Sequence, residues 1–388
     1  MVRYFIFLIS LFIKKENNKE LKIRPTDKVL VIKLDEIGDF VLMLPMIREL
    51  KLSMPTVQID LLTKNIVRNI VELCPYIENK YYLPNFLFKK NKFSKLLLLV
   101  YSIIYPLLTV RKKYDMVIVP RWDVDSSFSV FFSFFSNAKF RITYSEIINN
   151  TKKKYNKNYD KLYTHVLVDE TPKHEVERNL YILKYLNISV KNNNLEIWFD
   201  KNDEKIIDKY INKFDNNKII SICPAASHKR REWKHSNYQE IIYWLIQDYS
   251  FNIVIVGGKE DKDCFLFNSY GYENKLMDLR GKLTLRQTAL ILKKSILYIG
   301  NDTGPMHLSA AVGTPVIEIS AQPFNVDIKH PQSPLRFYPW GVKYKLLQPK
   351  FTTPPCPQNM CVSKYSHCIN NVSIDEVKFA VKELLHLP

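Results

Sequence analysis

The stretch that decides the fold is SILYIGNDTGPMHLSAAVGTPVIEIS, residues 295–320. It contains an apolar run at residues 296–299, a polar, glycine-containing turn, a small-residue segment at 305–312 and a second apolar run at 314–319. This order of strand, turn, helix and strand is typical of the βαβ units of a parallel sheet. Because such folds bind ligands beyond the carboxyl ends of their strands, the turn at residues 300–304 is a candidate site.

The same alternation continues outward from this stretch. Apolar runs of strand length alternate with amphipathic runs of helix length, which predicts doubly wound α/β domains. The predicted strands are residues 28–33, 57–62, 116–119, 195–198, 218–222, 252–256, 296–299 and 314–319. The predicted helices are residues 39–52, 125–136, 174–186, 237–248, 261–270, 284–295 and 305–312. The pattern breaks in the lysine- and asparagine-rich residues 149–160, and we place the connection between two domains at residues 187–194.

Composition narrows the class of protein. A chain of 388 residues with 46% hydrophobic and 25% charged residues suits two globular domains and excludes a disordered or fibrous chain. The net charge of +18 should attract a phosphate-bearing partner, which could be nucleic acid, anionic lipid or a nucleotide. Six cysteines are too few for a disulfide scaffold, so we expect a reducing cytoplasm. The motifs GxGxxG, GxxxxGK[ST], GxSxG and HExxH are missing, which argues against dehydrogenases and P-loop ATPases.

Two apolar segments raise the question of a membrane. Residues 1–24 are expected to form an apolar and basic extension whose run at 4–13 is too short to cross a bilayer, which takes about 20 residues. No small-residue cleavage site follows, so we expect no signal peptide. A second run, residues 96–110, is flanked by Lys89, Lys90, Lys92, Lys95, Arg111, Lys112 and Lys113. It is either a buried helix with solvated ends or a surface that rests on an anionic membrane.

A candidate catalytic carboxylate follows the predicted strand at residues 28–33. Gly38 permits a tight turn there, and Asp39 opens the next helix. Asp39 could be an N-cap that accepts hydrogen bonds from free N–H groups. It could equally be a base at the carboxyl edge of the sheet that takes a proton from a substrate hydroxyl. Asp35 and Glu36 are alternatives for this second role.

The turn after residues 296–299 is a candidate anion site. Free N–H groups of Thr303 and Gly304 at a helix start would point at an anion, and the helix dipole would reinforce them. This predicts a diphosphate site. The alternative is a capped helix in which Asp302 serves only the backbone and the small residues serve only close packing against the sheet. Separately, His307 could be a core histidine.

Two other loops follow predicted strands. In ASHKRREW, residues 226–233, an arginine is suited to bidentate phosphate contact, although adjacent cations are also typical of a solvated loop. In Gly257-Gly258-Lys259-Glu260 the backbone could approach a ribose, and Glu260 could accept its hydroxyl hydrogens.

Cysteines gather near the carboxyl terminus. Cys356, Cys361 and Cys368, together with His367, could supply four soft ligands to a metal. Their spacing does not match the paired CxxC motifs of a zinc ribbon, so ordinary thiols are the alternative. We therefore assign no metal to the predicted active site.

At these residues the chain resembles a known family. Ile37-Gly38-Asp39, DTGPMH at residues 302–307 and AAVGTP at 310–315 are similar to glycosyltransferase family 9, the ADP-heptose:lipopolysaccharide heptosyltransferases. The resemblance covers most of residues 26–387 and implies a GT-B fold, in which two Rossmann-like domains face a central cleft. It also implies an inverting mechanism without an obligatory metal. We expect an acceptor-binding domain at residues 25–190 and a nucleotide-sugar-binding domain at residues 191–388.

The resemblance also implies roles for single residues. Asp39 matches the catalytic base that activates the acceptor hydroxyl. Asp302 matches a residue that contacts the donor sugar, and Thr303, Gly304 and His307 match residues around the diphosphate.

The other implied donor-binding positions lie in earlier loops. Ser227 matches a phosphate contact, Glu260 a ribose contact, and Leu283 the position that holds adenine. Arg231 stands where the family has lysine, so the charge is kept but its geometry differs. This departure leaves a nucleotide-sugar donor expected and the identity of the sugar open.

The resemblance thus implies an inverting glycosyltransferase that moves a sugar, with heptose from ADP-heptose as the first expectation, onto a lipopolysaccharide core or related surface glycan. We expect no required cofactor, no nucleic acid partner and an anionic glycolipid or glycan acceptor. The expected location is the cytoplasm, with contact to the inner face of the cytoplasmic membrane as an option. Two alternatives stay open: a sugar-nucleotide epimerase on the same fold, and a non-catalytic basic protein that binds nucleic acid or lipid.

Overall fold

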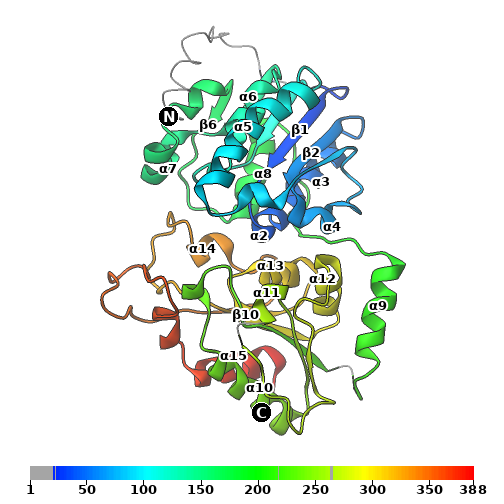
Figure 1. Cartoon of the computed structure of the whole chain (residues 1–388), viewed down its shortest axis with the longest axis vertical. Coiled ribbons are helices and arrows are strands. Elements are labelled where there is room, and N and C mark those ends of the chain that lie inside the picture. Colours follow the sequence, from blue (N-terminus) through cyan, green and yellow to red (C-terminus); the bar gives the residue numbers. More distant parts are fainter. Residues whose placement is uncertain (1–20, 22, 217, 263–264) are drawn as a thin grey trace. The chain divides into compact units, whose positions relative to one another are not determined.

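The computed structural model describes residues 21, 23–216, 218–262 and 265–388 (Figure 1). The chain divides between Asn193 and Asn194 into two compact units, which we call the first and the second unit. The division lies three residues beyond the predicted boundary at 190/191. The predicted extension at residues 1–24 lies outside the described residues, except for Leu21, Ile23 and Arg24.

The described part of the first unit contains a six-stranded parallel sheet in the order β3-β2-β1-β4-β5-β6. Its strands are β1 (Lys28–Lys33), β2 (Gln58–Lys64), β3 (Lys80–Leu83), β4 (Met116–Val119), β5 (Phe140–Tyr144) and β6 (His165–Leu167). Its α-helices are α2 (Ile37–Val41), α3 (Leu44–Ser53), α4 (Arg68–Val71), α5 (Lys92–Thr109), α6 (Ser129–Phe135), α7 (Asn150–Tyr155) and α8 (Glu175–Tyr185). Since successive side chains of a strand face opposite sides, Leu30 and Ile32 of β1 pack with Leu98 of α5 and Phe131 of α6 on one face.

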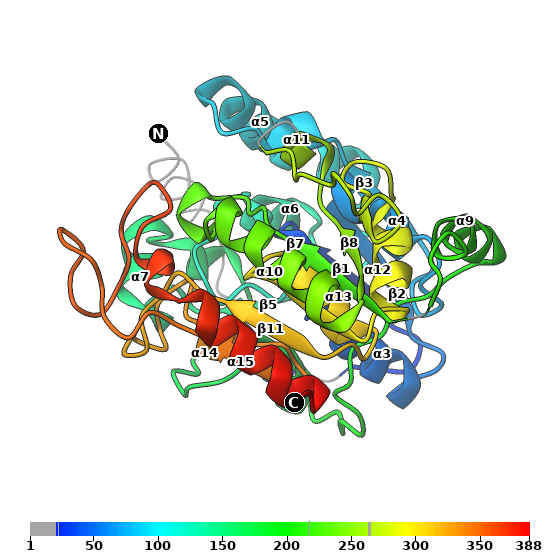
Figure 2. The ribbon, with the colours of Figure 1, turned by 90° about the horizontal axis from the view of Figure 1, so that it is seen from below.

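The described part of the second unit repeats this arrangement in the order β12-β11-β10-β7-β8-β9. Its strands are β7 (Ile219–Cys223), β8 (Asn252–Ile255), β9 (Leu276–Asp278), β10 (Leu297–Asn301), β11 (Val316–Ile319) and β12 (Tyr344–Leu347). Its α-helices are α9 (Lys201–Ile211), α10 (His235–Tyr249), α11 (Lys259–Lys262), α12 (Leu285–Lys293), α13 (Gly304–Ala311), α14 (Pro334–Phe337) and α15 (Ile374–Leu385). Helices α10 and α15 lie side by side over one face, as Figure 2 shows.

The predicted α/β fold class is confirmed, and each sheet has the strand order of a Rossmann-like domain. The winding direction reverses between β1 and β4 in the first unit and between β7 and β10 in the second. Ligands of open α/β sheets bind at such reversal points, beyond the carboxyl ends of the strands. Both candidate turns follow strands at these points.

Three element predictions are wrong. Residues 195–198 belong to neither sheet. The helix predicted at 261–270 ends at Lys262. The buried Arg280 guanidinium donates hydrogen bonds to the carbonyls of Asp261 at 2.9 Å and Phe265 at 2.7 Å, so these carbonyls are not left to helical hydrogen bonds. Within the supposed break at residues 149–160, α7 forms because the buried Lys152 ammonium donates to two backbone carbonyls, those of Arg121 at 2.8 Å and Tyr144 at 2.7 Å.

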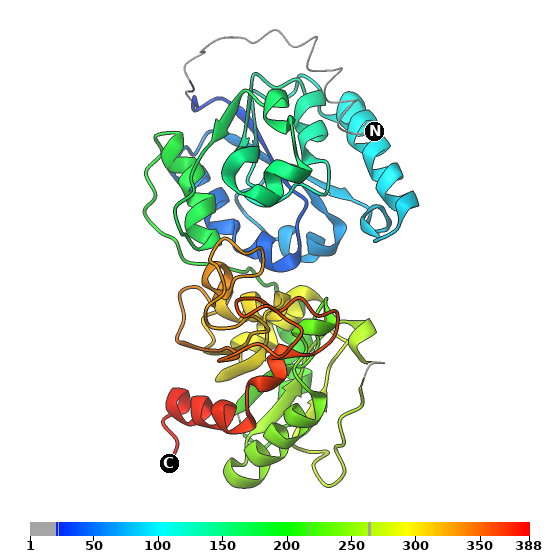
Figure 3. The same cartoon turned by 90° about the vertical axis from the view of Figure 1, so that its left-hand side faces the viewer.

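The interpretation of residues 96–110 as a buried helix is also wrong. Helix α5 runs along the outside of the first unit in Figure 3. Only Ser94, Leu98, Ser102 and Pro106, spaced by four residues, are buried. The opposite side exposes the apolar side chains of Phe93, Leu96, Val100, Ile104, Leu107 and Leu108.

Candidate functional site

Charged side chains converge beyond the carboxyl ends of β1 and β4 in the first unit. Asp35 lies 2.8 Å from the Lys33 ammonium through one carboxylate oxygen and 2.6 Å from an Arg121 guanidinium nitrogen through the other. Lys33 is buried and also donates to the Pro120 carbonyl at 3.2 Å. Because β1 and β4 are neighbours in parallel register, the residues that follow them meet at one edge.

Asp39 lies in the first turn of α2, at the same edge. The N-cap of α2 is Glu36, whose side chain makes no capping hydrogen bond, so the interpretation of Asp39 as N-cap is wrong. Burial raises the pKa of Asp39 to about 6, and the negative charges of Asp35 and Glu175 act in the same direction. A carboxylate with this pKa is ionised at neutral pH and still basic enough to take up a proton.

The two alternative carboxylates differ from Asp39 in their surroundings. Burial would raise the pKa of Asp35, but the charges of Arg121 and Lys33 outweigh it and lower that pKa to about 2. Glu36 is 73% exposed in its side chain and pairs with Lys64 at 2.8 Å. Asp35 therefore stays ionised beside its two cations and is a weak base. Of the three carboxylates, Asp39 is the best proton acceptor.

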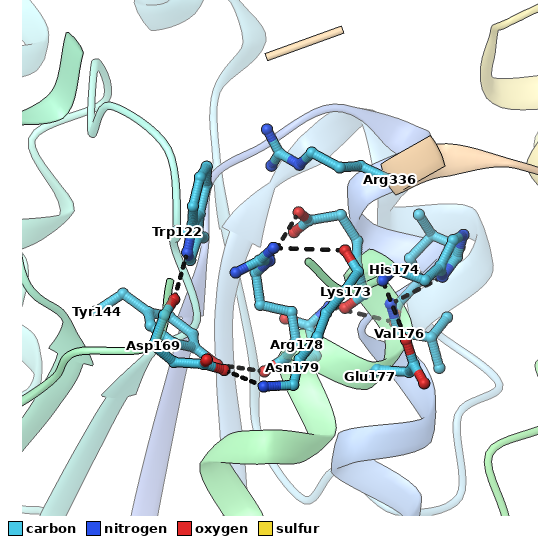
Figure 4. Close-up of polar contacts among 12 residues, drawn as sticks. Trp122, Tyr144, Asp169, Lys173, His174, Val176, Glu177, Arg178, Asn179 and Arg336 are labelled. Carbon is cyan, nitrogen blue, oxygen red and sulfur yellow. Dashed lines mark hydrogen bonds and ion pairs between the residues drawn. The ribbon is translucent and has the colours of Figure 1, made fainter. Parts of the chain in front are cut away.

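Figure 4 shows a network of polar contacts around Arg178 and Trp122, two buried residues of the first unit. The Arg178 guanidinium lies 4.2 Å from the ring centroid of Trp122, the residue next to Arg121, and its Nε lies 3.3 Å from a Glu175 carboxylate oxygen. The indole N–H of Trp122 donates to the Asp169 carbonyl at 3.2 Å. The network thus fixes the segment that carries Arg121 and the carboxylate that raises the pKa of Asp39.

Lys33 and Arg121 also belong to this site, although the sequence did not predict a role for either. The sequence feature that could have indicated such a role is their position at the end of a predicted strand. Lys33 ends the strand at residues 28–33, and Arg121 follows the strand at residues 116–119. The strand order that makes β1 and β4 neighbours was needed to bring them together.

In the second unit, Asn301 ties the turn after β10 to the loop after β7. Its buried side-chain carbonyl accepts from the Trp233 N–H at 3.3 Å and from the Tyr238 hydroxyl at 3.0 Å. Its amide group donates to the Pro224 carbonyl at 2.9 Å. These hydrogen bonds therefore fix the turn after β10 and the loop after β7 to each other at the reversal point of this sheet.

The start of α13 is open to an anion. Thr303 is the N-cap residue, but no side chain caps the helix, and the Thr303 hydroxyl donates instead to the Asn301 carbonyl at 3.3 Å. Among the described residues, no protein acceptor takes the N–H of Thr303 or of Gly304. The interpretation in which Asp302 caps this helix is therefore wrong, and two donors remain at the positive end of the helix dipole.

The Asp302 side chain faces the Arg231 guanidinium and a neutral imidazole instead of the backbone. Arg231, the last residue of the 3₁₀ helix η5 (Lys229–Arg231), donates to the Asp302 carbonyl at 3.0 Å and to its carboxylate at 3.3 Å. His307 Nε2 lies 3.9 Å from the other carboxylate oxygen. Burial lowers the pKa of His307 to about 4, so this imidazole is neutral at pH 7.

A residue that the sequence analysis missed lies close to this group. Glu318 of β11 is fully buried, and burial together with the negative charge of Asp302 raises its pKa well above the usual range. Its surroundings therefore favour the neutral, protonated form of this carboxyl group. An acidic residue in an otherwise apolar strand, VIEI, was the available signal.

The remaining predicted donor residues follow neighbouring strands. Ser227 is exposed after β7, Glu260 is exposed in α11 after β8, and Leu283 is half-buried just before α12, after β9. Parallel pairing of β7 with β10, β7 with β8, and β8 with β9 places the loops after these strands at the same sheet edge as Asp302.

Comparison with known proteins points to the same family as the sequence motifs. Residues 109–365, well over half of the chain, match the model of glycosyltransferase family 9 (heptosyltransferase). A lipopolysaccharide heptosyltransferase 3 of Escherichia coli is 25% identical over 288 residues, which are 73% of this chain and 80% of the relative.

Two solved structures share the fold. The glycosyl transferase family 9 protein of Veillonella parvula has a TM-score of 0.70 at 16% identity, covering 96% of this chain and 100% of that one. The E. coli heptosyltransferase WaaC with ADP has a TM-score of 0.64 at 16% identity, covering 92% and 99%. The fold is therefore GT-B, as predicted, and the chain belongs to glycosyltransferase family 9.

Proposed function

We propose that this glycosyltransferase transfers heptose from ADP-heptose to a lipopolysaccharide core or related bacterial surface glycan, with inversion at the anomeric carbon. The observation that carries the proposal is the turn at residues 302–304, where two free N–H groups lie beside the Arg231 guanidinium. The E. coli relative is named for heptosyl transfer to lipopolysaccharide, and the WaaC structure contains ADP.

The first unit would bind the acceptor and supply the base. Asp39 takes the proton of the acceptor hydroxyl while the oxygen forms a bond to the anomeric carbon of the donor sugar. The bond from that carbon to the diphosphate oxygen breaks on the opposite face, so the anomeric centre inverts. A positioned base of this kind contributes on the order of 10² to 10⁴ in rate.

The second unit would bind the donor and stabilise the leaving group. Negative charge grows on the departing diphosphate, and the Arg231 guanidinium with the N–H groups of Thr303 and Gly304 is placed to receive it. Asp302 and the neutral His307 would contact the sugar and the diphosphate. Ser227, Glu260 and Leu283 would contact phosphate, ribose and adenine. This chemistry needs no cofactor besides the donor.

Membership of the family argues against the two alternative functions. Family 9 consists of glycosyltransferases, so neither a sugar-nucleotide epimerase nor a non-catalytic binding protein is proposed further.

We also propose that the enzyme works at the cytoplasmic face of a membrane and contacts it through α5. Among the described residues, α5 is the one helix long and apolar enough to span a membrane, and 22% of the helix is buried. Its buried side packs on α6, which suits a helix lying in the interface. The apolar outer side and the lysines and arginines at both ends match an anionic lipid surface.

The test compares the wild-type enzyme with Asp39→Asn, using ADP-heptose and an acceptor glycolipid. We expect turnover to fall by about 10² to 10⁴, with ADP affinity unchanged. Glu36→Gln is the matched control because it removes an exposed carboxylate three residues away, and it should retain turnover. Equal turnover of Asp39→Asn and wild type would refute the proposed base. A stronger thermal shift with UDP-, GDP- or dTDP-sugars than with ADP-heptose would refute the proposed donor.

A further inference from the structure

Four side chains with soft ligand atoms converge in the second unit, outside the site described above. Cys356, Cys361, His367 and Cys368 place three sulfur atoms and a ring nitrogen within 4.8 Å of one another. His367 Nδ1 lies 3.5 Å from Cys356 Sγ and 3.4 Å from Cys368 Sγ. Cys356, Cys361 and His367 lie in the loop between β12 and the 3₁₀ helix η6 (Cys368–Asn371), and Cys368 is the first residue of η6.

The distances suit a tetrahedral ion. With metal–sulfur bonds of about 2.3 Å and metal–nitrogen bonds of about 2.0 Å, tetrahedral geometry requires sulfur–nitrogen separations of about 3.5 Å and sulfur–sulfur separations of about 3.8 Å. The two sulfur–nitrogen distances of 3.5 and 3.4 Å agree with this requirement. Three thiols and one imidazole are a ligand set of structural zinc sites, and thiolates also bind iron.

The thiols are also surrounded as metal-bound thiolates usually are. Cys361 is 2% exposed and Cys368 is fully buried. The backbone N–H of Thr353 donates to Cys368 Sγ at 3.4 Å. Such N–H donors orient ligating sulfur atoms and balance their charge.

The loop itself lacks another means of holding its shape. Residues 348–367 contain no helix and no strand, and a structureless connection of this length is uncommon in a compact domain. One disulfide would use two of the three clustered thiols and leave the third thiol and the imidazole without a role. A single ion would join all four side chains at once.

We propose that Cys356, Cys361, His367 and Cys368 form a closed structural site for one thiophilic metal ion, zinc or iron, that holds this loop against η5. All four positions are taken by protein ligands, so the ion has no open position for substrate. It would therefore stabilise structure and take no part in the transfer.

The connection to η5 is direct. Helix η6, which begins at the ligand Cys368, packs against η5, and the Trp233 indole N–H donates to the Val372 carbonyl at 2.9 Å. The Cys361 N–H donates to the side chain of buried Gln322 at 3.0 Å, which anchors the interior of the loop. Loss of the ion should loosen residues 229–233, and with them Arg231. An effect on donor binding rests in addition on the proposed function.

The experiment measures metal content and backbone protection in the purified full-length chain. Elemental analysis should find about one zinc or iron per chain, and cobalt substitution should give the intense visible bands of a tetrahedral thiolate site. Cys356→Ser and Cys368→Ser should each lose the metal. Cys74→Ser, which removes a buried thiol of the first unit, should retain it.

Two further readouts keep the test independent of folding defects and of transfer activity. In the wild-type chain, a mercurial reagent should release the metal as it titrates the thiols. Hydrogen exchange at residues 229–233 should then become faster. A chain that binds neither metal after anaerobic reconstitution overturns the site, and unchanged exchange after metal release overturns its role in holding η5. Failure of ADP to bind the metal-loaded chain would instead count against the proposed function.

Discussion

Asp35 and Asp39, four residues apart at the same sheet edge, have pKa values displaced in opposite directions, to about 2 and about 6. Asp35 takes both nearby cations and stays ionised, and its charge then adds to burial in raising the pKa of Asp39. Two like carboxylates thus acquire different properties from their surroundings. This relationship governs the first two predictions.

The rate of transfer should depend on the ionisation of Asp39. A base acts in its ionised form, so kcat/KM should be constant above pH 7 and fall as the pH drops through about 6. Initial rates with saturating donor and limiting acceptor, measured from pH 5 to 8, would show this limb. A profile that is flat down to pH 5 would contradict the assignment.

Replacing Asp35 should move the fall of kcat/KM to lower pH. Asp35→Asn removes a negative charge near Asp39 and frees Lys33 and Arg121 to stabilise the Asp39 carboxylate, so both effects lower the pKa of Asp39. The substitution also leaves two largely buried cations without their partner, which should cost about 3 kcal/mol of unfolding free energy. The pH profile and urea unfolding measure the two effects. If the folded variant lost kcat/KM at the same pH as the wild type, the predicted effect of Asp35 on the pKa of Asp39 would be contradicted.

Arg231 should matter more than its neighbouring cation. Arg231→Ala removes the guanidinium that contacts Asp302 beside the open N–H groups, and kcat should fall by about 10² to 10³. Arg231→Lys restores a charge without the planar fork and should recover part of the loss. Lys229→Ala, whose side chain is 54% exposed and pairs with Glu232, should leave kcat within twofold of wild type, about 0.4 kcal/mol. Equal losses of kcat in Arg231→Ala and Lys229→Ala would show that only the total positive charge matters, and would contradict a specific role of Arg231.

The outer side of α5 should bind anionic lipid. Leu108→Ser places a polar group on the most exposed apolar position of this helix, and binding to vesicles that contain phosphatidylglycerol should weaken about tenfold. Vesicles of phosphatidylcholine alone should bind weakly in every case. Phe379→Ser removes an exposed apolar side chain from α15 and is the control that should bind like wild type. Sedimentation with vesicles distinguishes these outcomes.

The sequence by itself determined the elements whose signal is local. The apolar runs of β1, β4 and β10 and the turn at residues 302–304 were found because a buried strand and a helix start need particular residues in consecutive positions. From these came the two α/β domains and the candidate positions Asp39, Asp302, Thr303 and Gly304.

Only the tertiary structure decided which of these positions act together and in what state. Arg121 lies 86 residues after Asp35 in the chain and reaches it only because β4 pairs with β1. The shifted pKa values of Asp39 and His307 arise from burial by several elements at once, which no short segment encodes. The exposure of α5 and the early end of α11 likewise depend on which neighbours pack against them, since an apolar or helical pattern is the same whether or not a partner covers it.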